Sequence, residues 1–195
     1  MVDETGGLGF KVVDGENVMR PDPIMEALAT MDATGIRPIA QTDFAHTFAA
    51  IGIDAGVPLD VRRGFLFARN AMCYGFWCYG LMTLGTQQMM RVADDGIARA
   101  AREHGLPKRL TFAERLSRLV ALGAVPTEDE PRWNALRRLR NNATHQESQQ
   151  ILTPANAAQM TTTVATLLAR VSWRATGHAT NAEAAESGAA ADHAE

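Results

Sequence analysis

The stretch AMCYGFWCYGLMTLGTQQMM at residues 71–90 decides the fold, because it is long, largely apolar and free of charged residues. Such a run raises the question of a membrane span, which needs about 20 predominantly apolar residues. Gln87 and Gln88 interrupt the run, and glycines at 75, 80 and 85 dilute it further. Each glycine weakens a helix by about 1 kcal/mol relative to alanine, which is tolerable where other helices pack closely. We therefore expect no membrane span, but one long helix over about 61–104, broken once at most and buried on most sides.

Hydrophobic periodicity predicts further helices on either side of this one. Thr111 and Glu114 form a capping box, and Pro131 and Pro154 stand at favoured first positions of helices. We expect helices from Asp22 to about 31, from Thr42 or Asp43 to about 51, from Thr111 to Gly123, from Pro131 to near Asn141–Asn142, and from Thr153 to about 171. Trp133, Leu136 and Leu139 are expected to face the core. The sequence thus predicts an all-α fold, a bundle of about four to five core helices around a long central helix, without strands beyond residue 20.

The net charge of −3 hides an asymmetry along the chain. Residues 1–59 carry three basic and nine acidic residues, residues 60–174 carry sixteen and nine, and residues 175–195 carry four acidic and no basic residues. We expect an acidic N-terminal segment over 1–59 with one or two helices, a helical domain over 60–175, and a disordered acidic tail over 176–195. A basic middle suits a phosphate-bearing partner. Its preference for arginine fits either bidentate phosphate contacts or the composition of a GC-rich genome.

Several familiar classes of protein are excluded by what the sequence contains. Cys73 and Cys78 lie in one apolar run and form no disulfide framework, so we expect reduced core cysteines and a cytoplasmic protein. The stretch MVDETGGLGFKVVDGEN at residues 1–17 has neither the basic nor the apolar region of a signal peptide, so we expect none. The sequence has no phosphate-binding loop of the Walker type and no nucleophile elbow. It also lacks a cluster with the spacing of metal ligands, so we expect no cofactor. The pair Asp94–Asp95 is interpreted as part of a solvated helix face.

The segment WNALRRLRNNATHQES at residues 133–148 carries the residues best suited to chemistry. Arg140 and His145 are five positions apart, which separates them by about 7.5 Å along a helix axis unless the helix ends near Asn141. A histidine can move a proton to or from a ribose hydroxyl, and an arginine can stabilise the charge that develops on phosphorus. These residues therefore suit RNA cleavage by the 2′-OH without a metal. The alternative is a surface helix end where the histidine only caps carbonyl groups.

The residues Leu139 to His145, LRNNATH, resemble the signature of the HEPN superfamily. That signature is an arginine followed by a polar residue and, after four to six intervening residues, a histidine. The order of helices expected over residues 60–175, with a final amphipathic helix after the motif, is similar to that superfamily as well. The resemblance covers about 115 residues and does not extend to residues 1–59.

The resemblance implies roles for individual residues. Arg140 would bind or polarise the scissile phosphate, His145 would act as general acid and base, and Asn141 would support them. Arg137 and Arg138 would add contacts to RNA. Members of the superfamily commonly form homodimers, and many are metal-independent endoribonucleases that act as toxins or in antiviral defence. An antitoxin or a nucleotidyltransferase is then a possible partner. Other members are non-catalytic modules that bind RNA or protein and dimerise, and this alternative stays open.

Overall fold

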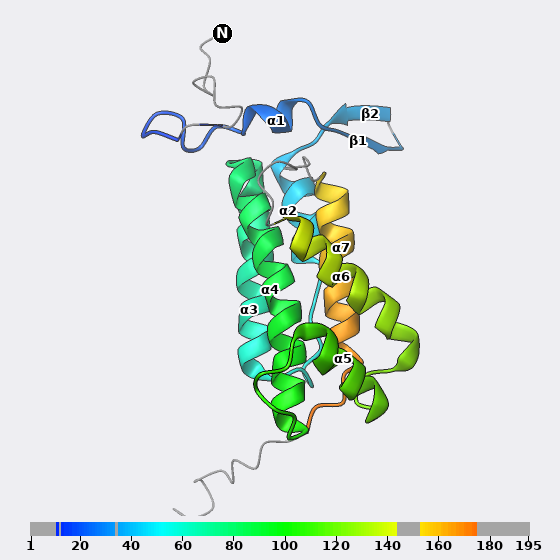
Figure 1. Ribbon diagram of the computed structural model, residues 1–195. Coiled ribbons are helices and arrows are strands. Elements are labelled where there is room, and N and C mark those ends of the chain that lie inside the picture. The colour runs from blue at the N-terminus through cyan, green and yellow to red at the C-terminus, as the bar shows by residue number, and fades with distance from the viewer. Residues whose placement is uncertain (1–10, 12, 34, 144–152, 175–195) are drawn as a thin grey trace, which may run out of the picture.

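The computed structural model of the protein describes residues 11, 13–33, 35–143 and 153–174. These residues form a helical bundle with one small β-hairpin (Figure 1). The elements are α1 (Pro23–Glu26), β1 (Ala29–Asp32), β2 (Gly35–Pro38), α2 (Gln41–Ala49), α3 (Leu59–Cys73), the 3₁₀ turn η1 (Tyr74–Phe76), α4 (Tyr79–Glu103), α5 (Phe112–Ala121), the 3₁₀ turn η2 (Thr127–Asp129), α6 (Glu130–Ala143) and α7 (Pro154–Ala169). The all-α class predicted from the sequence is confirmed.

The apolar stretch at 71–90 contains a reversal of the chain, so the single long helix expected over 61–104 is wrong. The chain leaves α3 through η1 and returns as the 25-residue helix α4, antiparallel to α3 (Figure 1). The helical pattern is the same on both sides of the turn, and sequence periodicity does not record direction. The sequence-based prediction includes one break in the helix but not a hairpin of two helices. The outer face of this hairpin is also more exposed than expected, since Phe67, Tyr74 and Leu84 are 70%, 62% and 59% exposed.

Two of the three glycines in this stretch lie at close approaches between elements: Gly85 where α4 meets α3, and Gly75 where the turn η1 meets α4. A Cβ atom at Gly85 would lie 2.8 Å from the backbone oxygen of Ala68 and 2.7 Å from Cγ of Met72. A Cβ atom at Gly75 would lie 2.7 Å from Cβ of Met82. Close packing therefore explains these two glycines, as the sequence suggested. Gly80 has no comparable neighbour, since the nearest atom to its Cβ position is Sγ of Cys78 at 3.7 Å.

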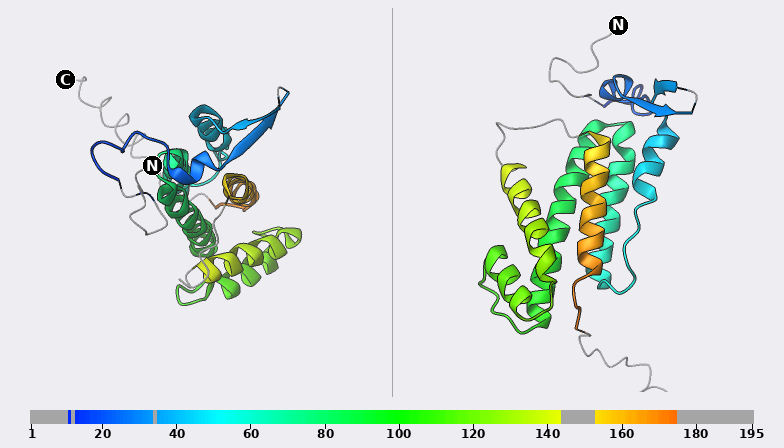
Figure 2. Two further views of the ribbon diagram at one scale, coloured as in Figure 1. Left: turned by 90° about the horizontal axis from the view of Figure 1, so that it is seen from above. Right: turned by 90° about the vertical axis from the view of Figure 1, so that its right-hand side faces the viewer.

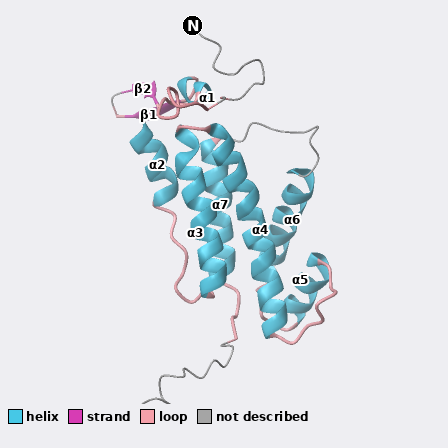
Figure 3. Cartoon of the chain, turned by 90° about the vertical axis from the view of Figure 1, so that its left-hand side faces the viewer, coloured by secondary structure: helices cyan, strands magenta, loops and turns pink. Residues whose placement is uncertain are grey.

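The bundle has a clear order from one edge to the other. Opposite side views both place α2 at one edge, α3, α7 and α4 in the middle, and α5 with α6 at the other edge (Figures 2 and 3). The core runs through all of these elements, so Phe44 and Phe48 of α2 are as fully buried as Trp133 of α6. The largest fully buried side chains also include Phe65, Met72, Met82, Met89, Ile97, Leu116, Leu119 and Leu167.

The segment before α2 lies across one end of the bundle and is fastened to the turn between α3 and α4 (Figure 1). Lys11 is only 4% exposed, and its Nζ donates to the carbonyl oxygens of Asn17, Arg20 and Trp77 at 2.6, 2.6 and 3.1 Å. Asp22 caps two helices, because Oδ1 accepts from the backbone N–H of Ile24 in α1 and Oδ2 from that of Tyr79 in α4. The turn is therefore held by groups far away in the sequence.

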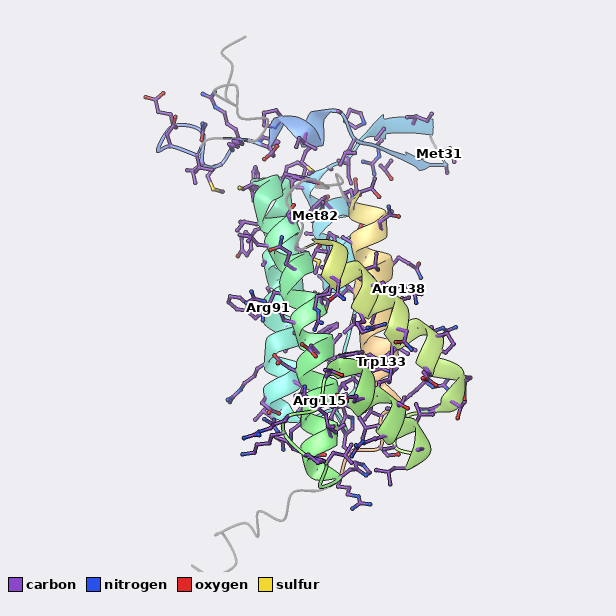
Figure 4. The ribbon with its side chains drawn as sticks, in the orientation of Figure 1. Met31, Met82, Arg91, Arg115, Trp133 and Arg138 are labelled. Carbon is purple, nitrogen blue, oxygen red and sulfur yellow. The ribbon has the colours of Figure 1, made fainter. Side chains whose placement is uncertain are left out.

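The β-hairpin corrects the expectation of a strand-free chain after residue 20. Strands β1 and β2 pair in antiparallel register, with Met31 opposite Ile36. The helix expected from Asp22 to about 31 stops at Glu26. Met31 and Ile36 are 78% and 79% exposed, so this hairpin projects from the bundle without burying its apolar pair (Figure 4).

The helices after residue 104 follow their local sequence signals. Thr111 and Glu114 form the predicted capping box at the start of α5, and Thr153 caps α7 with Pro154 at its first position. Helix α2 begins at Gln41 with Ala40 as its cap residue, two or three positions before Thr42 or Asp43, the caps that the sequence suggests. Among the residues that the structure describes, no helix is both long and apolar enough to cross a membrane.

Candidate functional site

Helix α6 carries the arginine cluster, and two buried residues fix its orientation. Trp133 is fully buried, with its ring centroid 6.5 Å from that of Phe112, and Leu136 is 5% exposed. The third residue expected in the core, Leu139, is 51% exposed, so that prediction is wrong. On a helix with 3.6 residues per turn, the positions 133, 136 and 140 form one stripe, and 139 lies beside it. Arg140 therefore takes the next inward position.

Arg140 lies in the last turn of α6, where three groups surround its guanidinium. Its Nη1 donates to Oδ2 of Asp94 in α4 at 2.6 Å, and its Nη2 donates to Oδ1 of Asn141 at 3.2 Å. Its Cζ lies 5.9 Å from the centroid of the Phe112 ring, within the range of a cation–π contact. The side chains of Arg140 and Asp94 are 32% and 35% exposed. The guanidinium is thus oriented by its neighbours and still reaches solvent.

Asp94 is therefore more than part of a solvated face, which corrects the interpretation of the pair Asp94–Asp95. Asp94 binds Arg140, whereas Asp95 is exposed. Although Asp95 is exposed as a residue, its carboxyl is partly desolvated by the surrounding protein, which raises its pKa, and the charge of Asp94 raises that pKa further. The two adjacent carboxylates thus have different environments, and only Asp94 bears on the arginine of the motif.

The structure places the other predicted residues along the same helix or outside its described part. Arg138 is exposed on the outer side of α6 (Figure 4). Arg137 is partly buried, and its Nε has no hydrogen-bond acceptor among the described residues. Asn141 is exposed and accepts from Arg140. His145 lies outside the described residues, so the pairing of Arg140 with His145 stays a prediction.

Asp94 and Phe112 are the residues at this site that the sequence did not point to. Phe112 of α5 is 8% exposed, and one face of its ring meets Arg140. Asp94 lies 46 positions before Arg140. No local sequence pattern connects residues so far apart. The contact depends on how α4 packs against α6, and the sequence carries no other signal for it.

Other features of the surface do not coincide with this site. A pocket of about 180 Å³ lies between α3 and α4, lined by Asp60, Val61, Gly64, Val92, Asp95, Ala98 and Arg102. None of the predicted site residues lines it. Within the described parts of the chain, no group of three or more histidine, cysteine or acidic side chains is arranged to hold a metal ion.

No family model, curated protein or solved structure matches the chain. The resemblance to the HEPN superfamily therefore rests on the motif and on the order of the helices, and it stays a prediction.

Proposed function

We propose that the protein is a metal-independent endoribonuclease that cleaves RNA through attack of a 2′-OH on the adjacent phosphate. The 2′-oxygen forms a bond to phosphorus after giving up its proton. The bond from phosphorus to the 5′-oxygen then breaks, and that oxygen takes up a proton. The products are a 2′,3′-cyclic phosphate and a 5′-hydroxyl. In this proposal His145 moves the protons, and Arg140 stabilises the charge that develops on the phosphate oxygens.

The observation that carries the proposal is the placement of Arg140. A guanidinium has five N–H donors in a fixed planar fork. Arg140 gives one to Asp94 and one to Asn141, so its fork retains donors for a phosphate at a position that is 32% exposed. The excess of basic residues over 60–174 supports an anionic substrate. Arg138 is exposed and lies three positions before Asn141, and it would contact the phosphate backbone of the RNA.

The biological setting expected from the resemblance belongs to this proposal as well. A homodimer would bring two copies of the motif together, and an action as a toxin or in antiviral defence would call for a controlling partner. An antitoxin or a nucleotidyltransferase would fill that role. A cytoplasmic location would give such an enzyme access to RNA.

One observation favours the alternative of a non-catalytic module that binds RNA or protein. The ion pair between Arg140 and Asp94, at 2.6 Å, is also what a purely structural arginine forms to join two helices. In that case Arg140 would stabilise the packing of α6 on α4, and RNA would be bound without being cut.

The test is cleavage of defined RNAs in excess EDTA by the wild-type protein and by the variants Arg140→Ala and His145→Ala. We expect the wild type to leave cyclic phosphate ends and both variants to lose activity while keeping their fold. Arg118→Ala is the matched control, because it removes one positive charge from an exposed position on α5 and should cleave normally.

Two results would contradict the proposal. If the wild type binds RNA and cuts none, the non-catalytic module is correct. If the wild type cuts RNA and both motif variants still do so at the wild-type rate, the site lies elsewhere.

A further inference from the structure

We infer that Asp94 is a positioning residue for Arg140 and that it fixes the guanidinium in the orientation that a phosphate oxygen requires. This inference rests on the proposed function, because a phosphate ligand at Arg140 is part of that proposal. Asp94 is distant in sequence and belongs to a different helix. Its role would be to act through Arg140 rather than to touch RNA.

The first step of the argument concerns mobility. An arginine side chain on a helix surface loses rotamer entropy when it is ordered. Arg140 is ordered before any ligand arrives, since its Nη1 lies 2.6 Å from Oδ2 of Asp94 and its Cζ lies 5.9 Å from the centroid of Phe112. Ordering a catalytic group in advance lowers the barrier of the step it assists.

The second step concerns which part of the guanidinium remains for the ligand. Asp94 contacts Nη1 and Asn141 contacts Nη2. The Phe112 ring lies against the guanidinium. These contacts fix the plane of the fork, and they leave N–H groups for an oxygen that approaches in that plane from solvent.

The third step concerns charge. A carboxylate near the site repels a polyanion, so on electrostatic grounds alone its removal should tighten RNA binding. A residue kept only to join α6 to α4 would act on stability and not on turnover. The positioning role predicts a different outcome, in which turnover falls although binding does not weaken.

The chain offers a matched control for this test. Asp95 stands next to Asp94, is exposed and makes no ion pair with Arg140. Asp94→Asn and Asp95→Asn remove the same charge from the same helix, and only the first changes the group that faces Arg140. Asparagine keeps an oxygen that accepts a hydrogen bond, which favours retention of the fold.

The experiment compares kcat and KM for cleavage of one defined RNA by the wild type and both variants in excess EDTA. For Asp94→Asn we expect kcat to fall on the order of 10- to 100-fold, with KM unchanged or lower. For Asp95→Asn we expect the wild-type kcat. Equal kcat for all three proteins, or a higher kcat for Asp94→Asn, would overturn the inference; the latter would mean that Asp94 restrains Arg140 instead of aiming it.

A second measurement separates this inference from the proposed function. The Nε–H signal of Arg140 in nitrogen-15 NMR reports the mobility of its side chain without any reaction. We expect it to be rigid in the wild type and in Asp95→Asn, and mobile in Asp94→Asn. If the wild type cleaves no RNA, the proposed function fails and this measurement decides whether Asp94 positions Arg140: equal rigidity in all three proteins overturns the inference.

Discussion

The two ends of α6 each lie beside an arginine–aspartate pair, and the pairs differ most in their burial. At the N-terminal end of α6, Oδ2 of Asp129 lies 2.7 Å from Nε of Arg170, which follows α7, and the Asp129 side chain is only 2% exposed. At the C-terminal end of α6, the side chains of Asp94 and Arg140 are 35% and 32% exposed. Arg170 also pairs with the exposed carboxylate of Glu128. Similar chemistry thus occurs in two different environments.

This difference separates a pair that holds the fold from a pair that can meet a ligand. A buried carboxylate that loses its partner keeps its desolvation cost, so the pair at Asp129 is important for stability. A half-exposed pair contributes about 0–1 kcal/mol to stability, because water competes for both groups. Stability therefore gives little reason for the precise contacts around Arg140, whereas the proposed phosphate ligand would give one.

The largest effect on stability is expected for Arg170→Ala, which leaves the buried Asp129 carboxylate without its close partner. We expect the free energy of unfolding to fall by about 2–3 kcal/mol, less than for a fully buried pair because the Arg170 side chain is 41% exposed. Urea denaturation at neutral pH measures the change. Asp94→Ala is the comparison variant and should lose no more than about 1 kcal/mol. Equal losses for the two variants would remove the distinction between the ends of α6.

A smaller effect is expected at the capping box that precedes Phe112. Thr111→Ala removes the side-chain cap of α5 and should lower stability by about 1 kcal/mol. The hydrogen bonds that Thr111 donates hold the pKa of Glu114 below its ordinary value of 4.5. A lowered pKa of an acid stabilises the fold above the unfolded-state pKa, and this contribution is lost as the pH falls through the lowered folded-state pKa.

The pH dependence gives this prediction its own test. The difference in stability between the wild type and Glu114→Gln should be constant above about pH 5.5 and shrink as the pH falls below 4.5. Denaturation curves recorded from pH 7 to pH 3 provide the comparison. A difference that does not change with pH would mean that the Glu114 carboxylate does not stabilise the start of α5 in its charged form.

The smallest effect is a change in the pKa of Asp95. Partial desolvation of the Asp95 carboxyl is the main cause that raises this pKa, and the charge of Asp94 adds to it. Asp94→Asn should therefore lower the pKa of Asp95 part of the way toward its ordinary value of 3.8, because only the second cause is removed. Carbon-13 shifts of the Asp95 carboxyl follow the titration. An unchanged pKa would show that the two carboxylates do not interact.

Structural features that depend on residues close together in the sequence were predictable from the sequence. The capping box at Thr111 and the start of α7 at Thr153 and Pro154 involve side chains within three positions of the groups they bind. The reversal at residues 74–78 was not predictable in this way. It is held by Lys11 and Asp22, whose contacts with Trp77 and Tyr79 cross 66 and 57 positions of sequence.

The same division applies to the candidate site. The sequence predicts a helix end close to Arg140 and Asn141, and both lie in the last turn of α6, where their side chains are in contact. Asp94 was interpreted as a solvated residue because its partner lies 46 positions away. The sequence-based stripe runs through 133, 136 and 139 and so predicts Leu139 in the core, whereas in the structure the stripe continues to Arg140 and Leu139 is exposed. Each of these errors concerns packing between helices, which a single helix sequence does not encode.

The most direct test of the account compares two arginines that each pair with an aspartate. Arg140 lies in the last turn of α6, and Arg170 follows α7 and pairs with Asp129 beside the start of α6. Arg140→Lys and Arg170→Lys keep their positive charge and remove the planar fork, and their cleavage of RNA is measured in excess EDTA at a temperature where both remain folded. The account predicts that Arg140→Lys cleaves about tenfold more slowly or worse, because lysine cannot reproduce a planar, stacked contact with phosphate. It predicts the wild-type rate for Arg170→Lys. Equal rates for the two variants, or loss of cleavage in Arg170→Lys alone, would contradict it.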